Sequence, residues 1–152
     1  MAQTDIVILS ANWQLWSVEE LNHTVAELKK RGVKQVAILG RKDQGLNGQM
    51  ILQRSLIKHS WMEGNLDRFS GNKRNNEAIN LNSMIKSLNG DFLYIDLMRI
   101  ACPEEHRCHV LTPDGDIIFV DVMHLSKHAY KFMGRKLYEE NGLAFLGMPF
   151  SK

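Results

Sequence analysis

Three short runs of consecutive apolar residues, each flanked by polar ones, are the strongest pattern along the chain. They cover residues 6–9, 36–39 and 92–95. Unbroken apolar runs of this length are typical of strands that are buried on both faces of a parallel sheet. The pattern therefore predicts three buried strands.

Two stretches with apolar residues at helical spacing separate these runs. The first begins at Ser17, which we expect to cap a helix together with Glu20, and it ends at Gly32. The second ends at Asn89-Gly90. The apolar positions are Val18, Leu21, Val25 and Leu28 in the first, and Ala78, Leu81, Ile85 and Leu88 in the second. A further helix is predicted over residues 49–61, followed by a polar surface loop over residues 64–76.

The last third of the chain predicts a hairpin and a helix. Residues 109–112 and 117–120 flank a turn sequence, Pro113-Asp114-Gly115-Asp116. Ser126 is expected to cap a helix that carries Ala129, Met133 and Leu137 and stops at Asn141-Gly142. Apolar residues 143–150 are expected to pack on the body of the protein.

Alternating strands and helices predict an α/β fold with three layers and a mainly parallel sheet, formed by residues 1–152 as one domain. Ligands bind at the carboxyl ends of the strands in such folds. Asn12 and the loop from Asp121 to His124 both follow strand ends, so we expect them to converge.

Composition and charge narrow the range of functions that the chain can have. A net charge of +2 with scattered basic residues gives no reason to expect nucleic-acid binding, and no apolar run has the length of a membrane helix. The first five residues lack the features of a signal peptide, so the chain by itself predicts a cytoplasmic location.

Three interpretations of Cys102 and Cys108 are open. The two cysteines can form a disulfide in an oxidising compartment or remain free thiols in the cytosol. With His106 and His109 nearby they can also ligate a metal, although no familiar ligand spacing is matched.

Asp121 and His124 are the candidate catalytic residues. A carboxylate that orients an imidazole forms two thirds of a hydrolytic triad. The alternative is structural, because an Asp at a strand end often caps a turn and a loop histidine is usually solvated. Ser10 also follows a strand, but its neighbours do not predict the sharp turn of a nucleophile.

Four features resemble the SGNH hydrolase superfamily, and most closely the SGNH domains attached to membrane acyltransferases that O-acetylate cell-surface polysaccharides. These are the segment 5–13 ending in Asn12-Trp13, the strand 35–40, the cysteine pair before a hairpin, and Asp121-x-x-His124-Leu125-Ser126 before a helix. The resemblance implies that His124 is the general base, that Asp121 orients it and that Asn12 donates to the oxyanion. It also implies a Cys102–Cys108 disulfide, an extracytoplasmic location and no cofactor.

The family's opening strand with its Gly-Asp-Ser nucleophile is absent, so the resemblance covers the later part of the domain. We therefore expect the first strand of the sheet to be missing and the serine to come from an upstream segment or another chain. The open sheet edge is expected to bind that segment or a second copy, and the substrates to be an acylated carbohydrate or acyl donor. The alternative is a non-catalytic remnant that serves as an interaction module.

Overall fold

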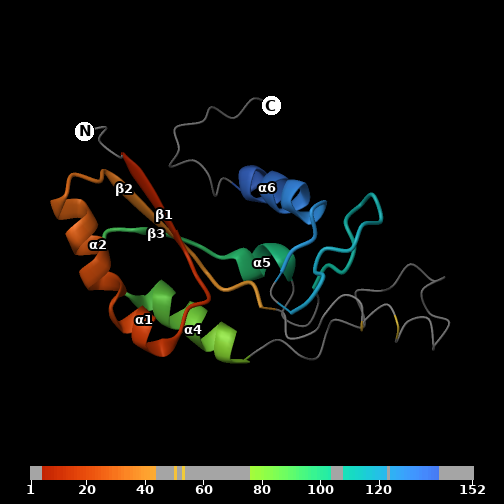
Figure 1. Cartoon of the computed structure of the whole chain (residues 1–152), viewed down its shortest axis with the longest axis horizontal. Helices are drawn as coiled ribbons and strands as arrows, with labels where there is room; N and C mark the ends of the chain where they lie inside the picture. The colour runs from red at the N-terminus through yellow and green to blue at the C-terminus, as the bar shows by residue number, and fades with distance from the viewer. Residues whose placement is uncertain are drawn as a thin grey trace.

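A three-stranded parallel sheet lies at the centre of the computed structural model, which describes residues 5–43, 50, 53, 76–103, 108–122 and 124–140 (Figure 1). The strands are β1 (Ile6–Ser10), β2 (Gln35–Leu39) and β3 (Leu93–Ile95), in the order β1-β2-β3. The register aligns Ser10 with Leu39 and Leu39 with Ile95, so the carboxyl ends of the strands lie side by side. The three strands that the apolar runs predict are confirmed.

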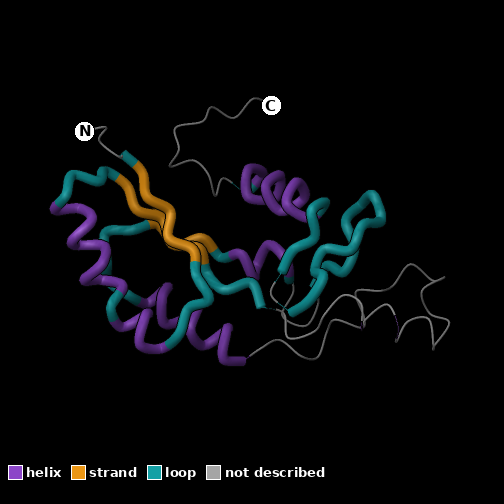
Figure 2. Tube along the Cα trace, in the orientation of Figure 1, coloured by secondary structure: helices purple, strands orange, loops and turns teal. Residues whose placement is uncertain are grey.

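Helices cover both faces of this sheet (Figure 2). On one face lie α1 (Leu15–Glu19), α2 (Leu21–Lys30) and α4 (Asn76–Ser87), and on the other lie α5 (Leu97–Ala101) and α6 (Ala129–Glu139). Neighbouring residues of β2 pack against the two layers. Ile38 belongs to an apolar cluster with residues of α1, α2 and α4, and Ala37 belongs to another with residues of α5 and α6. The predicted three-layer α/β fold is therefore confirmed.

The prediction that β1 is buried on both faces is wrong. Ile8 at its centre is 47% exposed, and Val7 and Leu9 are only partly buried. The reason is that β1 pairs with β2 alone among the described strands, so it forms an edge of the sheet. An apolar run predicts burial only where neighbouring elements complete the cover.

Ser17 does not cap the helix that it was expected to begin. Backbone at Gln14 is extended, the chain turns into α1 at Leu15, and Ser17 lies inside that helix. Its Oγ accepts from the backbone N–H of Gln14 at 2.9 Å and donates to the Gln14 carbonyl at 2.7 Å. The serine thus bonds back to the residue before α1, and α2 begins separately at Leu21. The predicted apolar face is confirmed at Val18, Leu21 and Val25, and Gly32 follows α2 with φ of 91°.

The second predicted helical face is confirmed in α4, where Ala78, Leu81 and Ile85 are buried. Of the helix predicted over residues 49–61, only Met50 and Gln53 are described, and both are helical. The loop predicted over residues 64–76 lies outside the described residues except for Asn76, which begins α4. The helix stop at residues 141–142 and the tail also lie outside them.

The predicted hairpin is present as a turn with bridges rather than as two strands. Leu111 and Ile117 form an antiparallel bridge, the N–H of Ile118 donates to the Val110 carbonyl at 2.9 Å, and Gly115 has φ of 88°. Ser126 Oγ accepts from the N–H of Ala129 at 3.1 Å, so it bonds the first residue of α6. Helical geometry nevertheless begins two residues later than a cap at Ser126 would predict.

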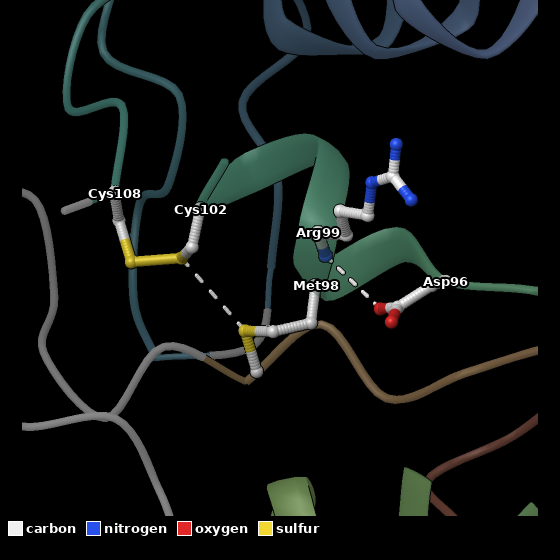
Figure 3. Close-up of a disulfide and its surroundings, with 5 residues drawn as sticks. All are labelled: Asp96, Met98, Arg99, Cys102 and Cys108. Carbon is white, nitrogen blue, oxygen red and sulfur yellow. Dashed lines mark hydrogen bonds between the residues drawn. A yellow bond between two sulfur atoms is a disulfide. The ribbon is translucent and has the colours of Figure 1, made fainter. Parts of the chain in front are cut away.

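Cys102 and Cys108 form a disulfide that joins the end of α5 to the arm of the hairpin (Figure 3). The N–H of His109 donates to the Ala101 carbonyl at 2.8 Å beside this link, and Met98 Sδ lies 3.8 Å from Cys102 Sγ. Of the three readings of the pair, the disulfide is therefore confirmed. Within the described residues, no group of three or more ligand side chains is arranged to hold a metal ion.

Candidate active site

Asp121 and His124 lie in a tight turn that the second antiparallel bridge, Phe119 to Leu125, encloses. Phe119 is fully buried, and the N–H of Val120 donates to the His124 carbonyl at 2.9 Å. The turn is thus anchored in the core on one side and directed to solvent on the other.

The carboxylate of Asp121 holds the histidine at two points. Oδ1 accepts from the backbone N–H of His124 at 2.8 Å, and Oδ2 lies 2.7 Å from its Nδ1. The ring is therefore oriented with Nδ1 toward Asp121, and no hydrogen bond within the described part of the chain occupies Nε2. This is the geometry in which an imidazole can take a proton through Nε2 while a carboxylate stabilises the charge that forms.

Both side chains of this pair are accessible, with exposed fractions of 71% for His124 and 48% for Asp121. Even with a charged histidine, a pair this exposed contributes at most about 1 kcal/mol to stability. The pair is therefore poorly explained as a stabilising device, and it is open to a ligand.

A cavity of about 200 Å³ lies beside His124, at the carboxyl ends of β1 and β2. Asn12 lines the same cavity, so the structure brings together the two segments that were expected to converge. The full lining is Ser10, Ala11, Asn12, Gly40, Arg41, Lys42, Asp43, Leu97 and His124.

Asn12 is held in place through the residue that follows it. Trp13 is only 6% exposed, and its indole Nε1 donates to the Leu39 carbonyl at 2.7 Å, which fastens the loop after β1 to the end of β2. The side chain of Gln14 donates to the carbonyl of Asn12 at 3.3 Å. The side chain of Asn12 remains exposed at the cavity.

A buried ion pair forms one wall of the cavity, and it was not predicted from the sequence. Arg41 and Asp43 are both about 7% exposed, and Nη2 of the arginine lies 3.3 Å from Oδ2 of the aspartate. Nη1 donates at 3.3 Å to the Trp13 carbonyl and, at the same distance, to Glu77 of α4. Nε is buried with no hydrogen-bond partner among the described residues, although an unpaired buried donor costs about 1–3 kcal/mol.

The backbone around Arg41 is fixed as tightly as its side chain. Asn82 of α4 accepts from the Arg41 N–H at 2.7 Å and donates to its carbonyl at 2.8 Å. A Cβ on Gly40 would overlap the Tyr94 hydroxyl and come within 3.0 Å of Asn82 Oδ1. Burial, and then the nearby Asp96 carboxylate, raise the pKa of Tyr94 well above its usual value. Two features of the sequence could have indicated this wall of the cavity: charged residues directly after an apolar strand, and a polar Asn82 on the apolar face of a helix.

Ser10 is the one serine that lines this cavity among the described residues. It ends β1, and no hydrogen bond joins it to His124 within the described structure. The arrangement thus brings together an imidazole, the carboxylate that orients it and a side-chain amide, and no serine among the described residues is paired with the imidazole. Across the same residues, no helix is long and apolar enough to cross a membrane.

Comparisons with known proteins bear on the fold and the family. The family model described as SGNH domain (fused to AT3 domains) matches residues 1–139. No curated protein matches the chain. Among solved structures, the periplasmic domain of a lipopolysaccharide acetyltransferase from Salmonella ser. Paratyphi A is similar, with a TM-score of 0.68 at 16% identity. The similarity covers 91% of this chain and 57% of that domain, so the chain spans little more than half of its length.

Proposed function

The chain belongs to the family of SGNH domains that are fused to AT3 domains, and from this premise we propose that it takes part in acyl-ester chemistry on a cell-surface polysaccharide. The reaction is O-acyl transfer or ester hydrolysis by a serine, histidine and aspartate mechanism. The observation that carries the proposal is the Asp121–His124 pair, whose histidine lines the same cavity as Asn12.

Each residue has a defined task in this reaction. Nε2 of His124 takes the proton of the serine hydroxyl as its oxygen attacks the ester carbonyl, and Asp121 stabilises the imidazolium. The side-chain amide of Asn12 donates to the oxyanion, a contact worth about a hundred- to a thousandfold in rate. The imidazolium then returns the proton to the departing sugar or donor oxygen. Attack by water on the acyl-serine completes hydrolysis, and attack by a sugar hydroxyl completes transfer.

The serine of this mechanism comes from outside the chain. An additional strand that pairs in parallel with the open edge of β1 would end at the cavity, because β1 itself ends there. The exposure of Ile8 supports this docking place, since an apolar side chain on an edge strand is typical of an unfilled interface. We propose that the occupant is a nucleophile-bearing segment or, failing that, a second copy of the chain.

The reaction takes place outside the cytoplasm in this proposal. The Cys102–Cys108 disulfide supports it, because such bonds persist in oxidising compartments. The similar Salmonella structure is a periplasmic domain, which is consistent with the same location. The substrates are an acylated carbohydrate or acyl donor, and the chemistry requires no cofactor.

A non-catalytic interaction module is the second candidate. The observation that favours it is the absence of a hydrogen bond between His124 and Ser10, the one serine among the described residues lining the cavity. In this reading the open edge of β1 binds a partner and the paired side chains are structural.

Hydrolysis of p-nitrophenyl acetate separates the two candidates. It is measured for the chain alone and for the chain joined to a Gly-Asp-Ser segment, each with His124→Ala and with a matched control, His128→Ala, at an exposed histidine 3.5 Å from Asp116. We expect turnover only in the joined protein, lost with His124→Ala and kept with His128→Ala. No turnover in a folded joined protein supports the interaction module. Turnover by the chain alone that is lost with Ser10→Ala contradicts an external nucleophile.

A further inference from the structure

We propose that Arg41 is a positioning residue for the oxyanion side of the cavity. This inference rests on the proposed function, because it takes Asn12 as the oxyanion donor. Arg41 touches no reacting atom in this account. It acts by fixing the loop that carries Asn12.

The connection runs through Trp13, the residue after Asn12. Arg41 Nη1 donates to the Trp13 carbonyl at 3.3 Å, while the Trp13 indole donates to the Leu39 carbonyl at 2.7 Å. Trp13 is thereby held through its main chain by Arg41, just after β2, and through its side chain by Leu39, at the end of β2. The Cα of a residue directly before such an anchor has little freedom to move. The anchor therefore fixes the backbone position from which the Asn12 side-chain amide extends.

Arg41 can serve as an anchor because it is itself immobilised. Its side chain reaches Asp43 in the same loop and Glu77 on α4, each at 3.3 Å. Its backbone exchanges two hydrogen bonds with Asn82, also on α4. The loop after β1 is therefore tied through one side chain to α4, a twelve-residue helix.

The contacts require a guanidinium. One planar group meets a backbone carbonyl, Asp43 and Glu77 in different directions, whereas a lysine ammonium is a single point of charge on a flexible stem. Two carboxylates already neutralise the charge of Arg41, so attraction of an anionic substrate is a poor explanation for it. Its effect should therefore fall on the rate of the chemical step rather than on substrate binding.

A double-mutant cycle between Arg41→Lys and Asn12→Ala tests this, with p-nitrophenyl acetate and the chain joined to a Gly-Asp-Ser segment. Misplacement of a donor by about 1 Å costs up to about a hundredfold, so we expect Arg41→Lys to lower kcat about ten- to a hundredfold with KM unchanged. The matched control is Arg99→Lys, at an arginine whose side chain is 73% exposed, and it should leave kcat unchanged. In the Asn12→Ala background, Arg41→Lys should have no further effect on kcat. A loss of the same size in both backgrounds overturns the proposal.

A second readout uses the chain alone and needs no activity. In ¹⁵N-labelled protein, Arg41→Lys should shift the Asn12 side-chain amide and the Trp13 indole N–H, and Arg99→Lys should shift neither. Signals of both groups that stay unchanged in folded Arg41→Lys protein overturn the positioning role. If the joined protein lacks esterase activity in every variant, the proposed function fails, and the amide and indole signals still decide whether Arg41 positions the loop.

Discussion

Arg41 and His124 line the same cavity, yet Arg41 is 7% exposed while the side chain of His124 is 71% exposed. The Arg41 wall of the cavity is assembled from three segments: the loop after β1, the loop after β2, and α4. The His124 wall is a single turn, in which acid and base are three residues apart.

The two walls obtain their order in different ways. Buried charges require complete pairing, because an uncompensated one is costly, so the Arg41 wall is rigid only while all of its partners are present. The turn at His124 is kept by two local hydrogen bonds to Asp121 and by the buried Phe119 behind it. The same chemical perturbation should therefore have very different consequences for stability on the two walls.

The largest effect is expected from Arg41→Met. It leaves Asp43 buried without its arginine partner, and removing one member of a buried pair typically costs about 3–5 kcal/mol in the free energy of unfolding. Arg99→Met, at an exposed site, should change that free energy by less than about 0.5 kcal/mol. Urea denaturation measures both. Equal, small losses in the two variants would show that the buried pair does not organise its wall.

Loss of the disulfide should loosen the link between α5 and the hairpin that leads to the His124 wall. Cys102 and Cys108 are six positions apart, and closing a loop of that size contributes about 2 kcal/mol by restricting the unfolded chain. Replacing both with serine should therefore lower the free energy of unfolding by about that amount. Reductant should destabilise the native chain similarly and leave the double variant unaffected; an equal response of both would contradict the assignment.

Gly40 tests how tightly the Arg41 wall is packed, and Gly134 serves as a control outside that wall. Gly40→Ala puts a methyl group against the Tyr94 hydroxyl and Asn82, and overpacking of this kind costs about 1–3 kcal/mol. Gly134→Ala, inside α6, meets nothing within 4 Å and should stabilise the protein by up to about 1 kcal/mol. Thermal unfolding gives the sign of each change. A Gly40→Ala protein as stable as the native one would mean that Tyr94 moves away freely.

The smallest effect on stability is expected from Asp121→Asn. Both partners are exposed, so the free energy of unfolding should fall by less than about 1 kcal/mol. In the joined protein, by contrast, kcat should fall by up to about 10⁴-fold, because the imidazole loses the tautomer that the carboxylate holds. A large loss of stability with activity retained would reverse the assignment of the two walls.

The sequence predicted the Asp121–His124 pair, and offered the disulfide as one of three alternatives, because both contacts are local. Asp121 and His124 meet through a spacing of three, and Cys102 and Cys108 through a short loop, so neither contact depends on the rest of the fold. The strands were equally visible as apolar runs. The roles of Asp121, His124 and Asn12 in catalysis stay predictions.

Local patterns draw attention to the charged residues after β2 and to Asn82, but they could not predict the contacts of the Arg41 wall. Its partners Glu77 and Asn82 lie on a helix that follows more than thirty residues later, and nothing in their spacing links them to Arg41. The apolar run did not predict the exposure of Ile8, because such a run does not reveal whether its strand lies at an edge; the open edge was expected only from the family resemblance, which implied a missing first strand. Both features are decided by which segments pack together.

The most direct test of the account is the tautomer of His124, read from long-range ¹H–¹⁵N correlations at a pH where the ring is neutral. The 2.7 Å contact between Nδ1 and Asp121 predicts a proton on Nδ1 and a bare Nε2 that can accept the proton of a serine. Asp121→Asn should abolish that preference. A proton on Nε2 in the native chain, or a tautomer ratio unchanged by Asp121→Asn, would contradict the assignment of Asp121 and His124 as an acid-oriented base.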